Sequence, residues 1–255
     1  MNSKTVDRLE RAGAVLLALV LWHLLSIILD NSIVLVSPLD VLLRLATIWQ
    51  QEGFFATVWF SFFRISAGFL LALLAGIILG TLAGRFRLLE ILLRPFVVTV
   101  QSVPVASVII ILLVWLSAGM LSAAVSFLIV FPIIYGNILT GFKERDYKLL
   151  EVSQVYGIRG LKKLRYITLP GLKSYLTAGC SSGLGLCWKA GIAAEVIGLP
   201  TGSVGSMLYN SKLYLNITDL FVWTLLIIVL SVGFEKLFLW LLKLFFRLTE
   251  EVKSK

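Results

Sequence analysis

Long apolar stretches dominate the chain and alternate with short polar connections. A bilayer core about 30 Å thick takes roughly 20 apolar residues in helical form, because hydrocarbon offers no partner to an open backbone polar group. Six stretches approach or exceed that length. They predict an all-α fold, an integral membrane bundle of six transmembrane helices at residues 12–29, 58–83, 95–116, 121–140, 172–194 and 217–242.

The first stretch follows Lys4, Arg8 and Arg11, so its start resembles a secretory signal. No small-residue cleavage pattern precedes Asp30, and the run is long enough to span. We therefore expect residues 12–29 to remain as a membrane anchor.

The connection between the first two stretches predicts a short amphipathic helix at the outer membrane surface. Ser37 suits the N-cap, Pro38 the first position and Asp40 the third, and Gly53 follows the last turn. One side of this helix is apolar, with Leu39, Leu42, Leu43, Ala46 and Trp49.

Composition supports a membrane protein, since 59% of the 255 residues are hydrophobic and only 15% are charged. One His and two Cys give little material for a metal site, a His-based catalytic group or a disulfide framework. Cys180 and Cys187 are seven residues apart on one predicted helix, about 10 Å along its axis, which is too far for a disulfide. We expect both to pack in the core, and we expect no metal site.

The positive charge indicates an orientation, because cytoplasmic loops hold the excess of Lys and Arg. Nineteen of the 23 basic residues lie before the first helix, between the second and third, after the fourth, and around the end of the sixth. Both termini are therefore expected in the cytoplasm. This gives a cytoplasmic N-terminus at 1–11, a six-helix transmembrane domain at 12–242 and a cytoplasmic tail at 243–255. The excess of basic residues then needs no nucleic-acid partner to explain it.

Small residues and prolines mark packing within the predicted helices. The second helix contains a stripe at strict four-residue spacing, formed by Gly68, Ala72, Gly76, Gly80 and Gly84. Such a stripe lets another helix backbone approach closely. Pro104 and Pro132 fall inside the third and fourth helices and predict a kink in each.

The longest predicted cytoplasmic connection, residues 141–171, is charged and helix-forming. We expect two short helices with an elbow at Gly157, whose left-handed conformation ends the first, while Pro170 stops the second. Basic residues accompany apolar Leu149, Leu150, Val152, Val155 and Tyr156. This pattern suits docking onto another protein; the alternative is an amphipathic hairpin that only faces solvent.

Residues within this connection resemble the EAA loop of permease subunits of bacterial ATP-binding-cassette importers. Glu151-Val152-Ser153, three residues, Gly157, nine residues and Ile167-Thr168-Leu169-Pro170 reproduce its spacing, although Val152 and Ser153 replace the two alanines. The resemblance implies ATPase coupling by Leu150, Glu151, Val152, Ser153, Val155, Tyr156, Gly157, Ile167, Leu169 and Pro170.

Nearly the whole chain resembles the branch of that family that serves nitrate, taurine, aliphatic sulfonates and bicarbonate. The matching blocks are Ser37-Pro38, Ser61-Phe62-Phe63-Arg64 with Gly68-Phe69, Arg94-Pro95 before Ser102-Val103-Pro104, Phe131-Pro132 and residues 183–195. Lys189 departs from the mostly apolar residues of the branch and leaves the solute open.

The resemblance implies an importer for a small anionic solute in a bacterial inner membrane. Its partners would be two ATPase subunits carrying ATP and Mg, a second copy of the permease in a homodimer, and an extracytoplasmic solute-binding protein. The chain lacks a G-x-x-x-x-G-K-[ST] phosphate loop and carries no catalytic residues of its own. We expect ATP hydrolysis in the partners and no cofactor in this chain.

Charged residues inside membrane helices are costly, which singles out Arg64, Lys189 and Glu195. Lys189 can offer an anion a counter-charge or reach the outer interface, whereas Arg64 is expected to pair with Glu195 or to cap carbonyls. Trp188, Glu195, Gln101 and Ser102 are further candidates for the translocation pathway.

Two other classes of transport remain open. Related branches share these motifs, so the solute can be a neutral heterocycle such as a vitamin precursor. A secondary transporter or channel would make the EAA-like loop incidental. An integral-membrane enzyme is disfavoured, because the chain lacks a cluster of His, Asp or Glu at one membrane face.

Overall fold

The computed structural model describes residues 3–31, 34–145, 147–158 and 160–251. Every regular element in these ranges is helical. The α-helices are α1 (Ser3–Leu29), α2 (Pro38–Thr47), α3 (Phe54–Arg85), α4 (Arg87–Ser102), α5 (Val105–Leu113), α6 (Ala118–Lys143), α7 (Tyr147–Val155), α8 (Gly160–Lys163), α9 (Leu169–Gly198), α10 (Val204–Leu213) and α11 (Ile217–Glu251). A 3-10 turn at Ile48–Gln50 follows α2, and a π-helical turn at Leu164–Thr168 joins α8 to α9.

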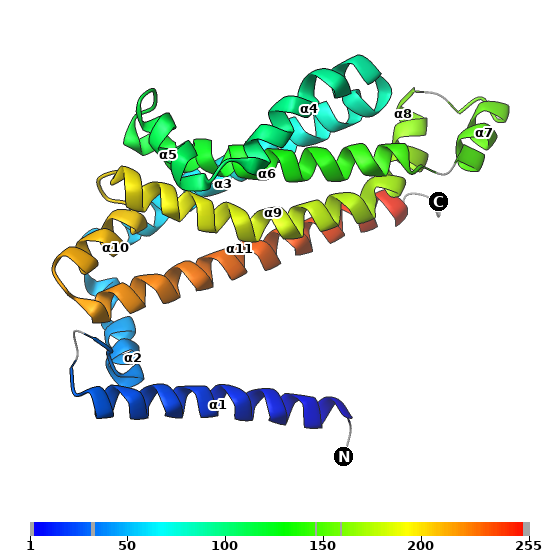
Figure 1. Ribbon diagram of the computed structural model, residues 1–255. Helices are drawn as coiled ribbons and strands as arrows, with labels where there is room; N and C mark the ends of the chain where they lie inside the picture. Colours follow the sequence, from blue (N-terminus) through cyan, green and yellow to red (C-terminus); the bar gives the residue numbers. More distant parts are fainter. Residues whose placement is uncertain (1–2, 32–33, 146, 159, 252–255) are drawn as a thin grey trace.

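Helices α3, α6 and α9 form the centre of the bundle (Figure 1). The small-residue stripe of α3 faces α6, where Gly76 meets Ile134, Gly80 meets Ile138 and Gly84 meets Phe142. Along these contacts the residue numbers of α3 and of α6 increase together, so the two helices run parallel. The predicted close approach is confirmed, and its partner is α6.

Helix α9 packs antiparallel to α6 through its own glycines. Gly179 lies against Asn137, Gly183 against Val130 and Gly198 against Leu121. Cys180 and Cys187 are free and buried on the same helix, as the sequence predicts.

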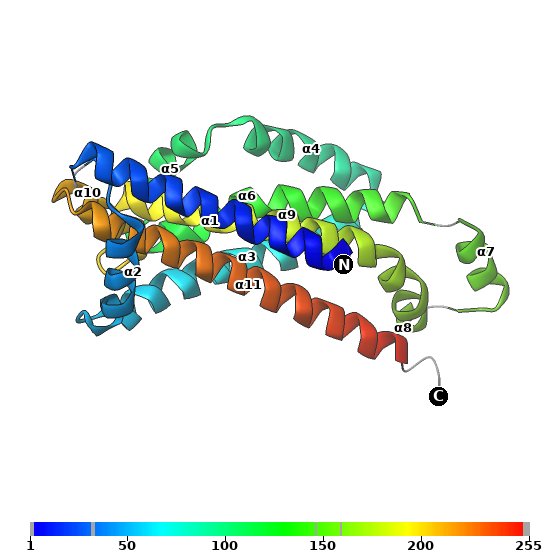
Figure 2. The ribbon, with the colours of Figure 1, turned by 90° about the horizontal axis from the view of Figure 1, so that it is seen from below.

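Helices α11 and α1 complete the bundle unequally. An aromatic cluster joins α11 to α3 and α9, with the ring centroids of Phe69 and Phe238 4.9 Å apart. Helix α1 stands away from the centre in Figure 1, and Figure 2 shows it from below, crossing in front of the bundle. It is held mainly by Trp22, whose indole Nε1 donates to the Val36 carbonyl at 3.0 Å and whose ring lies 5.4 Å from that of Phe221.

The third predicted span is broken, which corrects the expectation of one kinked helix. Helix α4 ends at Ser102, α5 begins at Val105, and their axes are bent by 105°. Val103 is extended (φ −81°, ψ 134°) because the ring of Pro104 disfavours helical geometry at the preceding residue. Pro132, in contrast, lies inside an uninterrupted α6.

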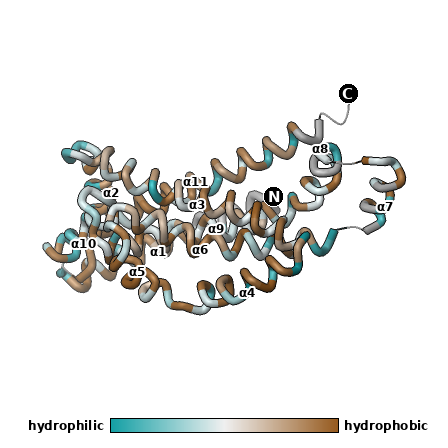
Figure 3. The backbone as a smooth tube through the Cα atoms, turned by 90° about the horizontal axis from the view of Figure 1, so that it is seen from above, coloured by the Kyte–Doolittle hydropathy of each residue, from teal (hydrophilic) through white to brown (hydrophobic). Residues whose placement is uncertain are grey.

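By length and composition, α3, α6 and the apolar part of α11 can each cross a membrane, and the bent pair α4–α5 gives a fourth candidate. The apolar part of α1, Gly13–Leu29, is shorter, and α9 is less apolar than these helices. Helix α9 is largely enclosed by protein, so small residues that pack closely replace large apolar ones. Apolar residues line the long helices and hydrophilic ones gather towards their ends (Figure 3).

Helix α2 begins as predicted, because the Ser37 hydroxyl accepts a hydrogen bond from the Asp40 amide at 3.2 Å. Gly53 does not simply follow this helix; it is the N-cap of α3, with φ +75°. Val41 and Ile48 are buried against the protein, and the predicted apolar face points outward, with Leu43 67% exposed.

Candidate functional site

Helix α7 ends in the elbow that the sequence predicts. Gly157 has φ +63°, a conformation that glycine adopts without the steric cost of a Cβ atom. Across this turn the Ile158 amide donates to the Ser153 carbonyl at 2.8 Å, while the Tyr156 amide donates to Val152. These bonds satisfy carbonyls that the end of α7 leaves open.

Helix α7 protrudes beyond the ends of α6, α9 and α11 (Figures 1 and 2). Its apolar side chains face outward, with Val155 84% and Tyr156 77% exposed. Val152 and Glu151 are exposed as well, whereas Ser153 is buried. The side chain of Leu150 lies outside the described part of the structure.

The second half of the predicted loop connects directly to the bundle. Ile167, Leu169 and Pro170 are partly buried. The prediction that Pro170 stops a helix is wrong, because Pro170 lies in the first turn of α9. Proline suits this place because its nitrogen has no proton that would need an acceptor. The π-helical turn is therefore directly continuous with α9, and a movement of the turn would also move the start of α9.

Glu195 is completely buried near the end of α9, and it joins three helices. Its Oε2 atom accepts hydrogen bonds from the Ser61 hydroxyl of α3 at 2.7 Å and from the Gly205 amide of α10 at 3.1 Å. Ser61 Oγ in turn accepts from the Val204 amide at 2.9 Å. The arrangement binds the first turn of α10 to α3 and α9.

Sequence reasoning missed α10 and the partners of Glu195. Ser203 caps the helix by accepting from the Ser206 amide at 3.0 Å, and Ser206 Oγ accepts from the Ser203 amide at 3.2 Å. This reciprocal pair was the available signal, since Ser is a favoured N-cap residue. Ser61 gave a weaker signal by lying seven residues before Gly68, on the face of the small-residue stripe.

Trp188 is also enclosed within this subunit. It is 1% exposed, and its ring lies 5.8 Å from that of Phe62 and 6.2 Å from that of Phe234. In the single chain Trp188 and Glu195 thus belong to the packed interior, and their predicted pathway role stays a prediction.

Lys189 lies on the opposite, exposed side of α9. Beside the exposed Leu186, the same side carries small and polar residues over several turns, here called the α9 stripe: Ser174, Ala178, Ser181, Ser182, Gly185 and Lys189. A Cβ atom at Gly185 would meet nothing within 4 Å, so the stripe is open at this residue. At its edge, Ser181 Oγ donates to Glu235 Oε1 of α11 at 3.4 Å.

The remaining candidates lie elsewhere. Gln101 and Ser102 are exposed in the last turn of α4, and no hydrogen bond joins them to Lys189 in the described ranges. Arg64 makes no ion pair with Glu195 within the described chain; its guanidinium lies 4.1 Å from the ring centre of Phe60. The described residues contain no group of three His, Cys, Asp or Glu side chains suited to a metal ion.

An ion pair joins α2 to α11 at the end of the molecule away from α7 (Figure 1). Arg44 Nε of α2 lies 2.5 Å from Asp219 Oδ1 of α11, and Arg44 also donates to Asp219 Oδ2 at 3.2 Å. The hydrogen bond to Asp219 raises the pKa of Arg44. The guanidinium therefore remains charged and holds α2 beside α11.

Comparison with known protein families identifies the family to which this helical chain belongs. Residues 72–250 match the family model described as the binding-protein-dependent transport system inner membrane component. The chain belongs to this family. The match runs from within α3 to the end of α11 and includes the protruding α7 and the whole of α9.

Several relatives are transport permeases. A probable ABC transporter permease protein of Brucella melitensis is 25% identical over 219 residues, covering 85% of this chain and 87% of the relative. The taurine transport system permease protein of Escherichia coli K12 is 28% identical and covers 79% and 75% of the two chains. The nitrate import permease protein of Leptolyngbya laminosa is 30% identical and covers 61% and 55%. The chain is thus an inner-membrane permease of the ABC transporter type.

Proposed function

We propose that this chain forms the translocation pathway of an ATP-driven importer for a small anionic solute of the sulfonate, taurine, nitrate or bicarbonate type. Two copies would enclose the path, two separate ATPase subunits would supply ATP and Mg, and an extracytoplasmic binding protein would deliver the solute. The names of the taurine and nitrate relatives support the solute class.

The observation that carries the proposal is the exposed α9 stripe. Its charged and hydroxyl groups lie within a long helix at the centre of the bundle, where exposure to hydrocarbon is unfavourable. A second copy and a water-filled path between the copies would remove that cost. Lys189 would then give an anion a counter-charge inside the path.

The proposed membrane arrangement has six spans: α1, α3, the bent pair α4–α5, α6, α9 and α11. We include α9 as a span despite its lower hydropathy, because neighbouring helices cover one side of it and a second copy would cover the other. Alternating directions then put both termini and α7 on one side of the membrane. The basic residues at that end favour the cytoplasm.

Coupling to the ATPases is proposed at α7 and its elbow. Val152, Val155 and Tyr156 present an apolar surface that the bundle does not cover, which is typical of a docking surface. Closure of the two ATPases would move α7, and the partly buried Ile167, Leu169 and Pro170 would transmit the displacement to α9.

Uptake assays test the proposed pathway and its solute class. We expect Lys189→Ala to weaken uptake of an anionic solute about tenfold, because a charge pair in a poorly hydrated path contributes roughly 1.4 kcal/mol or more. Radiolabelled taurine and nitrate are suitable probes, with a neutral heterocycle such as thiamine for comparison.

Lys212→Ala is the matched control, since Lys212 is an exposed lysine at the end of α10 rather than on the α9 stripe. It should leave uptake unchanged. Unchanged uptake and apparent affinity in Lys189→Ala would exclude the counter-charge role, and transport of thiamine alone would exclude an anion importer.

A further inference from the structure

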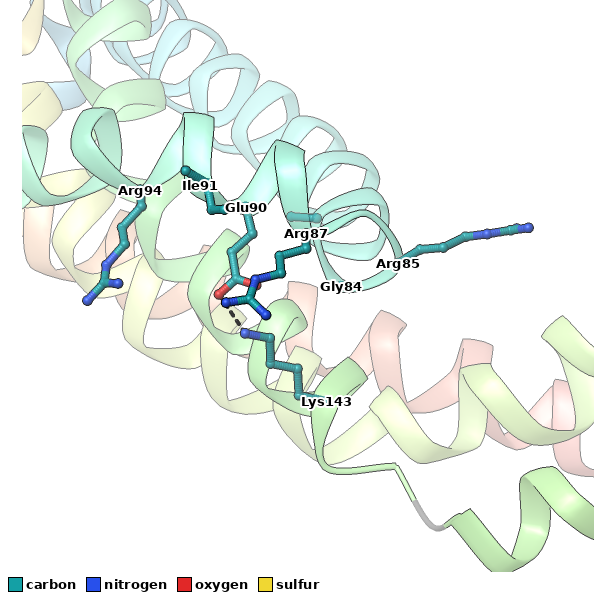
Figure 4. Close-up of a pocket in the computed structure, with 8 residues that line it drawn as sticks. Gly84, Arg85, Arg87, Glu90, Ile91, Arg94 and Lys143 are labelled. Carbon is teal, nitrogen blue, oxygen red and sulfur yellow. Dashed lines mark hydrogen bonds and ion pairs between the residues drawn. The ribbon is translucent and has the colours of Figure 1, made fainter.

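A charged hollow lies at the end of the bundle nearest α7. It has a volume of about 420 Å³ and lies between the end of α3, the start of α4 and the end of α6 (Figure 4). We call it the basic hollow, because its charged lining residues are Arg85, Arg87, Glu90, Arg94 and Lys143.

The charges around the basic hollow do not balance. Lys143 Nζ lies 2.5 Å from Glu90 Oε1, so this pair is neutral as a whole. Within the described chain, Arg87 and Arg94 form no ion pair or side-chain hydrogen bond. Among the described residues Glu90 is therefore the one acidic side chain that faces four basic ones, and an anion would reduce the repulsion between the guanidinium groups.

The two arginines are well placed for an anion with several oxygen atoms. They are seven residues apart on α4, which puts them on one face, two turns or about 10 Å apart. Figure 4 shows Arg87 beside Glu90 and Lys143, while Arg85 extends away from the hollow. Guanidinium groups bind phosphate oxygens in a forked geometry that suits a phosphate group.

The surroundings of the hollow favour a lipid over a soluble anion. Helices α3 and α6 are apolar enough to cross a membrane, and both end at the hollow, at Arg85 and Lys143. The hollow is also lined by apolar Ile91, which is 57% exposed, and Leu88 and Leu92 are exposed on the adjoining side of α4. A soluble anion would use only the arginines, whereas a phospholipid would also cover the leucines.

We propose that the basic hollow binds the phosphate of an anionic phospholipid, with the acyl chains against Ile91 and the adjoining leucines of α4. Arg87 and Arg94 hold the phosphate, and the Glu90–Lys143 pair forms one wall. Basic pockets between helix ends are known to select anionic headgroups. This inference needs only membrane insertion, so it is independent of the transported solute and of ATPase docking.

Native mass spectrometry of the full chain tests the proposal. The chain is released from micelles that contain equal amounts of phosphatidylglycerol and phosphatidylcholine. The unchanged protein should retain phosphatidylglycerol preferentially, and Arg87→Gln with Arg94→Gln should reduce its retention about tenfold or more. Arg94→Gln alone should give a smaller loss, which keeps the test valid if the double variant does not fold.

Arg247→Gln is the matched control, since Arg247 is exposed near the end of α11. Helix α11 finishes at the end of the bundle that carries α7 (Figure 1). It should retain phosphatidylglycerol normally. An equal loss in the control, or no preference in the unchanged protein, would overturn the site. Displacement of the lipid by an equal concentration of inorganic phosphate would overturn its assignment to a lipid.

Discussion

Glu195 occupies the place where α9, α3 and α10 meet. A buried carboxylate is costly unless polar groups surround it. Here the Ser61 hydroxyl and the Gly205 amide supply two hydrogen bonds to one oxygen, and the amide belongs to the first turn of α10. The positive end of that helix dipole faces the carboxylate. Glu195 therefore fixes α10 in position, and this explains why it is enclosed within one subunit.

Replacing Glu195 should destabilise the chain without changing its surface. Glu195→Ala leaves Ser61 and the Gly205 amide without their acceptor and creates a cavity, so we expect a loss of about 2–4 kcal/mol. Thermal unfolding in detergent measures the change. Glu52→Ala, at an exposed loop residue, should have no effect. Equal melting temperatures for both variants would contradict the role of Glu195.

Glycine is required at position 157 for its backbone conformation, not because a side chain would clash with neighbouring atoms. A Cβ atom there would meet nothing within 4 Å, but φ is +63°. Gly157→Val should abolish coupled ATP hydrolysis in the reconstituted importer while the chain still inserts, since β-branched residues disfavour this conformation. Gly157→Asn should retain most activity because Asn tolerates it. Similar activity in both variants would exclude a conformational role for the elbow.

At the scale of elements, the contact between α3 and α6 depends on missing side chains. A Cβ atom at Gly76 would lie 2.7 Å from Ile134 Cγ2 and 3.1 Å from the Tyr135 nitrogen, so α6 would have to move. Gly233, within α11, would meet nothing within 4 Å. Alanine should therefore lower stability at Gly76 but not at Gly233.

Gly76→Ala should lower stability by about 1–3 kcal/mol through overpacking. Gly233→Ala should leave it unchanged or raise it by about 0.5–1 kcal/mol, because alanine favours the helix. Thermal unfolding of both variants in the same detergent checks the sign. Destabilisation by both substitutions would contradict the claim that Gly76 is closely packed and Gly233 is not.

The sequence predicts elements best where the signal is local. The stripe from Gly68 to Gly84 is periodic, so the close approach of another helix follows from spacing alone. Pro104 predicts a disturbance but not its size, since the 105° bend depends on how α5 packs against α6 and α9. Pro170 was misjudged because proline both ends a helix and suits its first turn.

The sequence predicts less of the candidate site than of the helices. The elbow at Gly157 is local and was predicted, whereas the contact between Ser61 and Glu195 joins residues 134 positions apart. The sequence identified Glu195 as unusual but could not distinguish a pathway residue from a buried anchor. Only the packing of α3, α9 and α10 shows that its carboxylate is enclosed.

At the scale of the whole molecule, the two exposed features lie in different regions. The α9 stripe faces outward from the centre of the bundle, and α7 protrudes from its end (Figure 1). Continuous chain links them, through α8 and the π-helical turn into α9. This layout suits a subunit that receives movement at one end and changes access to a path along its centre.

Copurification with the ATPase subunit tests the central claim most directly. Tyr156 and Tyr214 are 77% and 78% exposed. Tyr156 directly follows α7 and Tyr214 lies between α10 and α11, at opposite ends of the bundle (Figure 1). Tyr156→Ala should strongly reduce ATPase recovered with the full chain and the ATP-driven uptake that depends on it, because it removes apolar docking surface. Tyr214→Ala should leave ATPase recovery unchanged. Full ATPase recovery and uptake with Tyr156→Ala, even when combined with Val155→Asp, would contradict docking at α7.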